Sequence, residues 1–170
     1  MNRVGIGYDV HQFKDGRKLV IGGVTIPHDK GLEGHSDADV LAHAIADALL
    51  GAVGEADIGK HFPVNDPRWD GIDSMIILEN VARIVRRDGA NIVNVDSTII
   101  AQEPKMAPHI PAMKARMAEA LHLRPYQIGI KATTNEHMGF IGRGEGIAAM
   151  AVVSVLAAGA GKTTRVKLEP

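Results

Sequence analysis

The segment IAAMAVVSVLAA, residues 147–158, limits the possible folds more than any other part of the chain. It is almost entirely apolar and lacks the alternation of polar and apolar residues that marks a strand with one face in water. A strand of this kind is covered on both faces. We therefore expect it to be a central strand of a sheet that carries helices on one face and packs against other subunits on the other.

Strands and helices alternate along the rest of the chain. Two N-terminal strands, residues 3–11 and 17–27, are separated by Asp15-Gly16 and are predicted to pair as a hairpin. This order favours an α+β fold, a two-layer domain with a mixed β-sheet covered on one face by helices. The further elements expected are helices from Ser36 to about Gly51, from Ser74 to about Asp88 and from Pro108 to about Leu123, and strands at 91–102 and 127–134.

The length of 170 residues suits a single domain, expected at 1–158, followed by a polar and frayed tail at 159–170. The formal net charge of −1 does not suggest nucleic-acid binding. Cysteine is absent, so metal ligands must be histidine or carboxylate. The N-terminus lacks the apolar run of a signal peptide and no segment reaches the length of a membrane span, so we expect a cytoplasmic protein.

The first helix combines an apolar body with an acidic and histidine-rich stripe. On a helical wheel Ser36, Asp39, His43 and Asp47 fall within roughly 80°, and neither lysine nor arginine accompanies them. Ser36 can cap this helix, with Asp39 as the capping-box acid. Histidine and aspartate without a counter-cation are typical of a metal site, although a histidine hydrogen-bonded to Asp39 or Asp47 inside a core is the alternative.

A second part of this metal site is predicted at the end of the first strand. Asp9 and His11 are two residues apart, so both side chains point to the same side of the strand. Together with His43 they offer one carboxylate and two imidazoles, a set that suits zinc or manganese with a position left for substrate. The same set also forms the facial triad of non-haem iron enzymes, and a metal-dependent binding protein without turnover is a third possibility.

Two loops carry anion-binding features. Thr133, Thr134 and Glu136 precede the glycine-rich stretch GFIGRGEG, a combination that suits a diphosphate and a magnesium ion, although a tight turn alone would explain the glycines. The loop AQEPKMAPHI, residues 101–110, exposes backbone groups that can read a base edge, with Lys105 available for phosphate. By itself, the second loop indicates only the start of a helix.

Six segments together resemble the 2-C-methyl-D-erythritol 2,4-cyclodiphosphate synthase family of the non-mevalonate isoprenoid pathway, and the resemblance runs nearly from end to end. They are GYDVH, IGGVTIP, GHSDADVLAHAIADALLGA, DIGKHFP, TIIAQEPKMAPHI and KATTNEHMGFIGRGEGIA. The resemblance implies a lyase that closes the 2-phosphate of a cytidine-diphosphate-linked methylerythritol onto its β-phosphorus and releases CMP. It also implies a homotrimer with active sites between subunits, no nucleic-acid or membrane partner, and two ions per site, a zinc-type ion and a second magnesium or manganese ion.

The resemblance further implies a role for each matching residue. His35 and Thr134 stabilise the transition state, Asp9, His11 and His43 hold the zinc-type ion, and Glu136 holds the second ion. Asp39 and Asp47, each one helical turn from His43, are expected to orient it. The substrate-binding set is Ser36, Asp57, Gly59, Phe62, Asp66, Ala101, Pro104, Lys105, Met106, Ala107, Thr133, Asn135, Phe140 and Arg143.

One position departs from the family pattern. Many relatives carry an aspartate-threonine pair after Phe-Pro, whereas here Val64 and Asn65 precede Asp66. We expect this change to weaken contacts to the methylerythritol hydroxyls without loss of chemistry, because no metal ligand is involved.

Overall fold

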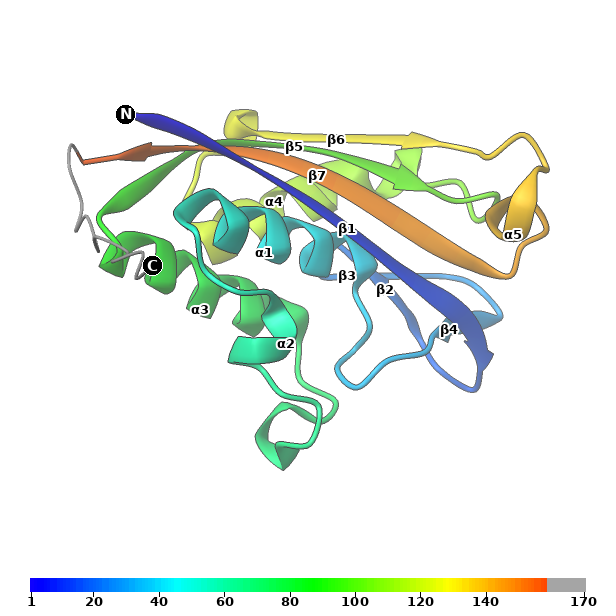
Figure 1. The fold of residues 1–170 in the computed structure, drawn as a ribbon. Helices are drawn as coiled ribbons and strands as arrows, with labels where there is room; N and C mark the ends of the chain where they lie inside the picture. Colours follow the sequence, from blue (N-terminus) through cyan, green and yellow to red (C-terminus); the bar gives the residue numbers. More distant parts are fainter. Residues whose placement is uncertain (159–170) are drawn as a thin grey trace, which may run out of the picture.

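The computed structural model describes residues 1–158, so the predicted tail at 159–170 lies outside the described residues. A long strand opens the chain and three short strands follow it, and helices and strands alternate from α3 onward (Figure 1). The strands are β1 (Asn2–Asp15), β2 (Leu19–Ile21), β3 (Val24–Ile26), β4 (Lys30–Leu32), β5 (Ala90–Ile100), β6 (Ile128–Thr133) and β7 (Gly146–Ala157). The helices are α1 (Val40–Val53), α2 (Ile58–His61), α3 (Ser74–Arg87), α4 (Ile110–Leu121) and α5 (Gly139–Gly142), with 3-10 turns at Pro67–Trp69, Ala107–His109 and Pro125–Gln127.

The main sheet is mixed, as predicted. Its five strands run in the order β4-β1-β7-β5-β6, with β5 and β6 parallel and the other neighbours antiparallel. The apolar segment at 147–158 forms β7, the central strand, which pairs with β1 on one side and β5 on the other. The α+β class is therefore confirmed.

The predicted pairing of the first two strands is wrong. β1 pairs with β7 and β4, while the stretch 17–27 folds on itself as a separate hairpin of β2 and β3. Gly22 and Gly23 both adopt positive φ, 62° and 69°, which permits this two-residue reversal. Strand partners that lie more than 130 residues apart, such as Tyr8 and Met150, cannot be read from a local turn signal.

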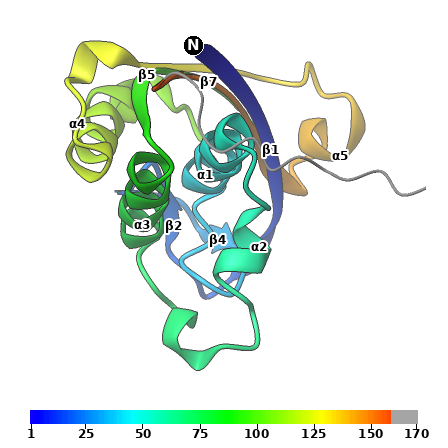
Figure 2. The same cartoon turned by 60° about the vertical axis from the view of Figure 1, so that its left-hand side comes forward.

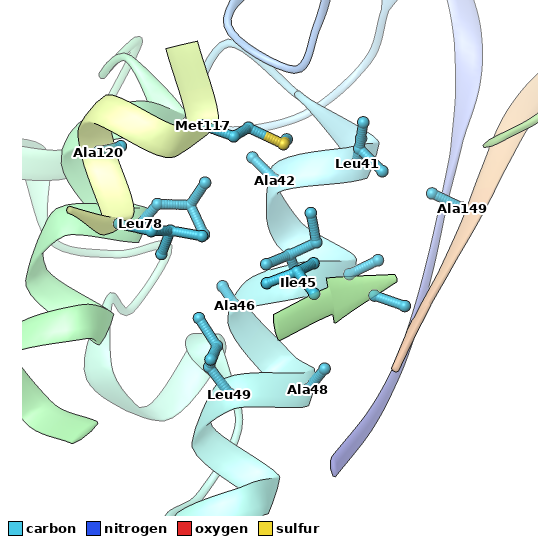
Figure 3. Close-up of a cluster of buried hydrophobic side chains, with 14 of the residues drawn as sticks. Leu41, Ala42, Ile45, Ala46, Ala48, Leu49, Leu78, Met117, Ala120 and Ala149 are labelled. Atoms are coloured by element: carbon cyan, nitrogen blue, oxygen red, sulfur yellow. The ribbon is translucent and has the colours of Figure 1, made fainter. Parts of the chain in front are cut away.

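Helices α1, α3 and α4 cover one face of the sheet (Figures 1 and 2). Helix α1 packs on β1 and β7 and against α3. Its side chains Leu41, Ile45 and Leu49 are fully buried. Figure 3 shows Leu41 on the side of the sheet, near Ala149 of β7, and Ala42 and Leu49 on the side of Met117 of α4 and Leu78 of α3. The predicted second and third helices are both present, and Pro108 and Pro111 lie at the helix starts as expected.

The opposite face of the sheet carries a row of exposed apolar side chains. Val4, Ile6 and Tyr8 of β1 lie beside Met150 and Val152 of β7, and each is between 44% and 66% exposed in the single chain. Apolar side chains on adjacent strands form a contiguous patch of the kind that marks an interaction surface. Within residues 1–158, no helix is long and apolar enough to cross a membrane.

Candidate active site

Three side chains from two elements converge at one point beneath the sheet. Asp9 and His11 project from β1 and His43 projects from α1, and one ligand atom from each lies within 4.8 Å of the other two. Asp9 Oδ2 is 2.9 Å from His11 Nε2 and 3.1 Å from His43 Nδ1, and the two ring nitrogens are 3.2 Å apart. The cluster predicted from Asp-x-His and the helix histidine is therefore present.

Close packing of β1 on α1 brings these residues together. Asp9, His11, Gly5 and Gly7 lie on the helix-facing side of β1. A Cβ atom at Gly5 or Gly7 would be only 1.9 Å from a carbonyl oxygen of α1. Because neither glycine has a side chain, the strand approaches the helix closely enough for one ion to be shared between them.

The hydrogen bonds around the two imidazoles fix which nitrogens face inward. His11 Nδ1 is 2.6 Å from the carbonyl oxygen of Glu33, which only accepts, so His11 Nδ1 carries the proton and Nε2 faces Asp9 as a lone pair. His43 presents Nδ1 to Asp9, and its Nε2 is 3.1 Å from the hydroxyls of both Ser36 and Ser74. The inward donor set is thus a carboxylate oxygen and two nitrogens, which fits a zinc-type ion.

Asp9 and His11 shift each other's pKa values. Burial raises the pKa of the Asp9 carboxyl, but hydrogen bonds to His11 and His43 outweigh it and hold the pKa well below its ordinary value. Burial lowers the pKa of His11, but Asp9 outweighs it and raises the pKa above its ordinary value. Both shifts arise from the attraction between the Asp9 carboxylate and the neighbouring imidazoles.

A pocket of about 190 Å³ opens beside the three ligands. His35 and Ser36 line it at the entrance of α1, and the imidazole Nε2 of His35 is buried without a hydrogen-bond partner among the described residues. Gly59 and Phe62, which are predicted to bind substrate, also line it. Val64, the position that departs from the family pattern, lines it too. Sequence reasoning missed three apolar lining residues, Ile58, Trp69 and Ile77, because nothing in the local sequence distinguishes them from core residues.

The loop that carries His35 is held from two directions. The guanidinium of Arg17 donates to the carbonyl oxygens of Gly34 and Ser36, both at 2.6 Å. The carbonyl oxygen of His35 accepts a hydrogen bond from the Gly71 N–H at 2.9 Å. Arg17 was not predicted, because it is distant in sequence from the carbonyls that it holds.

The structure corrects three expectations about α1. The N-cap is Asp39, whose carboxylate accepts from Ala42 N–H, and Ser36 lies before the helix with its hydroxyl toward His43. Asp39 does not orient His43, because its oxygens also accept from the N–H groups of Gly22 and Gly23. Asp47 does not orient His43 either, since its carboxylate accepts from Ile58 N–H at the start of α2.

Asp57 and Asp66 organise the segment beyond this pocket. Asp57 caps α2 by accepting from Lys60 N–H. Asp66 caps the turn at Pro67–Trp69 and pairs with the guanidinium of Arg68, which holds the pKa of Asp66 at about 2. In this structure both carboxylates therefore have structural partners next to the pocket.

The remaining predicted residues gather at the ends of β5 and β6. The Ala101 N–H donates to the Thr133 carbonyl, and the Thr134 hydroxyl lies 3.3 Å from a carboxylate oxygen of Glu136. Lys105 is exposed, whereas the Met106 side chain packs in the core. None of this second group lines the 190 Å³ pocket. The group comprises Ala101, Pro104, Lys105, Met106, Ala107, Thr133, Thr134, Asn135 and Glu136.

The glycine-rich connection contains the short helix α5, which was not predicted. Its Phe140 lines a separate hollow of about 470 Å³ with His11 and Gln12, and Arg143 pairs with Glu145 at 2.6 Å. Glu145 lines the same hollow, so Phe140 and Arg143 lie beside the C-terminal part of β1, and neither lines the 190 Å³ pocket.

Comparison with known proteins shows the family of the chain. The model of the YgbB family matches residues 2–156. The chain belongs to the YgbB family. It is 62% identical over 153 residues to the 2-C-methyl-D-erythritol 2,4-cyclodiphosphate synthase of Halalkalibacterium halodurans, covering 90% of this chain and 98% of that relative.

Two solved structures share the fold. The bifunctional IspDF of Campylobacter jejuni superposes with a TM-score of 0.89 at 40% identity, and the match covers 93% of this chain and 43% of that longer protein. The IspF of Plasmodium falciparum in complex with CDP has a TM-score of 0.80 at 33% identity, with 92% of this chain and 96% of that chain covered. The predicted family is therefore confirmed.

Proposed function

We propose that this chain is a 2-C-methyl-D-erythritol 2,4-cyclodiphosphate synthase of the non-mevalonate isoprenoid pathway. The observation that carries the proposal is the cluster of Asp9, His11 and His43 beside a pocket, in a chain of the YgbB family. The names of its relatives supply the reaction, and the CDP-bound structure among them supports a cytidine nucleotide as ligand.

The reaction exchanges one phosphorus–oxygen bond for another. An oxygen of the substrate 2-phosphate attacks the β-phosphorus of the cytidine diphosphate, and the bond between the β-phosphorus and the bridging oxygen breaks. CMP leaves with that electron pair, and the cyclic diphosphate remains. Neither water nor a redox partner is consumed, so catalysis depends on positioning and on neutralising phosphate charge.

Residues of the first pocket would perform the charge neutralisation. Asp9, His11 and His43 would hold a zinc-type ion, which supplies Lewis-acid polarisation of a phosphoryl oxygen when bound. His35 would donate from its unpartnered Nε2 to a phosphate oxygen of the transition state. Ser36, Asp57, Gly59, Phe62 and Asp66 would contact the ribose and methylerythritol.

The second group of residues would come from a neighbouring subunit. β1 and β6 are three strand positions apart in the sheet, which corresponds to roughly 14 Å. Asp9 and Thr134 of one chain are therefore too far apart to act on the same phosphorus. A homotrimer that packs the apolar sheet faces together would bring the β6 end of one subunit to the metal ligands of the next.

In that arrangement the β5 and β6 loops would bind the nucleotide. Ala101, Pro104, Lys105, Met106 and Ala107 would surround the cytosine and its phosphates, mainly through backbone groups and the Lys105 ammonium. Thr134 would stabilise the transition state, and Glu136 would hold a second magnesium or manganese ion. Thr133, Asn135, Phe140 and Arg143 complete the proposed contacts.

The proposal places the enzyme in the cytoplasm, because a nucleotide diphosphate of this charge does not cross a membrane unaided. No step of the proposed reaction involves nucleic acid or a membrane surface.

A turnover assay separates the proposal from its rivals. Incubation with 4-diphosphocytidyl-2-C-methyl-D-erythritol 2-phosphate, zinc and magnesium is expected to release CMP and the cyclic diphosphate in equal amounts. A non-haem iron oxygenase would instead require iron and oxygen, and a binding protein would bind metal without turnover. Absence of CMP at every metal composition would refute the proposed reaction.

A further inference from the structure

The buried hydroxyl of Ser74 connects His43 to an acid that the proposed chemistry does not use. Ser74, the first residue of α3, is 0% exposed. Its Oγ lies 3.1 Å from His43 Nε2 and 2.5 Å from Asp37 Oδ1. The other oxygen of Asp37 accepts from the Ser74 backbone N–H at 3.1 Å. Asp37, Ser74 and His43 thus form a continuous series of hydrogen bonds, and its last member, His43, is one of the three proposed metal ligands.

The Asp37 carboxylate at the end of this series determines the direction of each hydrogen bond. An ionised carboxylate only accepts, so the Ser74 hydroxyl donates its single proton to Asp37. Ser74 Oγ is then left as an acceptor with two possible donors, His43 Nε2 at 3.1 Å and the Ser36 hydroxyl at 3.4 Å. The shorter contact assigns the donated proton to His43 Nε2. His43 Nδ1 is consequently the lone pair that faces Asp9 and His11.

The Ser36 hydroxyl, which also lies near His43, does not fix the direction of the hydrogen bond to His43 Nε2. Ser36 Oγ also lies 3.1 Å from His43 Nε2, and it accepts from the Ala38 N–H at 3.2 Å. Its own proton is not committed to a carboxylate, so it can point toward or away from the imidazole. Asp37 alone supplies a fixed acceptor at the end of the chain.

We propose that Asp37, acting through Ser74, is a positioning residue that holds His43 as the Nε2–H tautomer and thereby presents its Nδ1 lone pair to the metal. A group that fixes the tautomer of a ligating histidine typically accounts for 10- to 100-fold in metal affinity. The inference rests on the proposed metal site, but it concerns a property of the imidazole that exists before any metal binds.

Asp37→Asn is the informative substitution. An asparagine amide turned toward Ser74 Oγ donates to it, which frees the hydroxyl proton to point at His43 Nε2 and favours the opposite tautomer. Asp73→Asn is the matched control, because Asp73 caps the same helix by accepting from Met75 N–H and does not contact His43. Asparagine caps helices about as well as aspartate, so the control removes the same charge with little change in stability.

The tautomer is measured first, in metal-free protein. Two-bond proton–nitrogen correlation spectra of ¹⁵N-histidine-labelled protein distinguish the two neutral forms of His43. The wild type and Asp73→Asn are expected to show Nε2–H, and Asp37→Asn a mixture or the Nδ1–H form. Zinc affinity, measured by competition with a chromophoric chelator, is expected to fall about 10- to 100-fold in Asp37→Asn alone.

A second variant keeps the test decisive if Asp37→Asn does not fold. Ser74→Ala removes the fixed acceptor and leaves Ser36, so the tautomer is expected to become mixed and zinc affinity to fall. An unchanged Nε2–H tautomer in the variant that folds would overturn the inference, even if zinc binding weakened. Absence of zinc binding by the wild-type protein would instead refute the proposed metal site.

Discussion

The backbone of Gly7 lies directly against the carbonyl oxygen of Ala44, so that a Cβ atom at position 7 would be only 1.9 Å from that oxygen. This contact sets the separation between β1 and α1, and therefore between the ligands of β1 and His43. Gly7→Ala is expected to lower the free energy of unfolding by about 1–3 kcal/mol or more, because overpacking forces the two elements apart. Chemical denaturation measures this loss.

Gly51, in the helix α1 that Gly7 contacts, provides the control for Gly7→Ala. A Cβ atom at Gly51 would have no atom within 4 Å, and Gly51 lies inside α1. Gly51→Ala is therefore expected to stabilise the protein by up to about 1 kcal/mol through helix propensity. If Gly7→Ala left stability and zinc affinity unchanged, the close approach of strand and helix would not be what assembles the site.

The His43 side chain is expected to be essential for metal but not for assembly. His43→Ala should abolish zinc binding and CMP release while the protein remains a trimer, because His43 lies beneath the sheet and the apolar patch lies on its other face. Elemental analysis and light scattering measure the two properties. His28→Ala, which changes a histidine outside the cluster, is the control. Full zinc occupancy in His43→Ala would contradict the ligand assignment.

The exposed apolar face of the sheet is expected to be the trimer interface. Val152→Glu places a charge in this patch and should dissociate the trimer and remove activity, since buried unpaired charges are strongly disfavoured. Size-exclusion chromatography with light scattering reports the assembly. Ile76→Glu is the control, because Ile76 has nearly the same exposure, 43% against 46%, but lies on α3. A trimeric, fully active Val152→Glu variant would show that assembly uses another surface.

Asp39 is expected to make stability depend on pH. Burial, followed by the charge of Asp37, raises the pKa of Asp39 from 3.8 to about 6, although three backbone N–H groups oppose the shift. Between these values the folded protein holds more protons than the unfolded chain, so its stability falls as pH rises from about 4 to about 6. At about 1.4 kcal/mol per pKa unit, the loss is about 3 kcal/mol.

Urea unfolding between pH 4 and pH 7 measures this effect of Asp39. Asp39→Asn removes the ionisable group and is expected to flatten the decline by the same amount. Asp29→Asn, at an exposed position, controls for the loss of one negative charge. Parallel pH curves for the wild type and Asp39→Asn would rule out the raised pKa.

Val64 is expected to weaken substrate binding. It lines the 190 Å³ pocket, at a position where the family resemblance implies an aspartate. A carboxylate there can accept a hydrogen bond from a methylerythritol hydroxyl, which contributes about 0.5–1.5 kcal/mol. Val64→Asp should therefore lower the Michaelis constant by roughly 2- to 10-fold with little change in kcat. Steady-state kinetics test this, with Ile76→Asp as control, and an unchanged Michaelis constant would contradict it.

Much of the architecture follows from the sequence alone. The apolar run at 147–158 predicted a central strand, and that strand is β7. The spacing of apolar residues predicted helices from Ser36 and from Ser74, and the structure has α1 from Val40 and α3 from Ser74. Asp9, His11 and His43 were predicted as one site because strand and helix periodicities place each side chain on a definite face.

The tertiary structure decided which groups surround the site. Asp37, Ser74 and Arg17 carry no local signal, because each acts on an atom that is distant in sequence. Asp39 and Asp47 are one helical turn from His43, yet each carboxylate is used by backbone N–H groups of other segments. Local periodicity fixes the face on which a side chain lies, whereas its hydrogen-bond partner depends on how distant segments pack, and only the folded chain determines that.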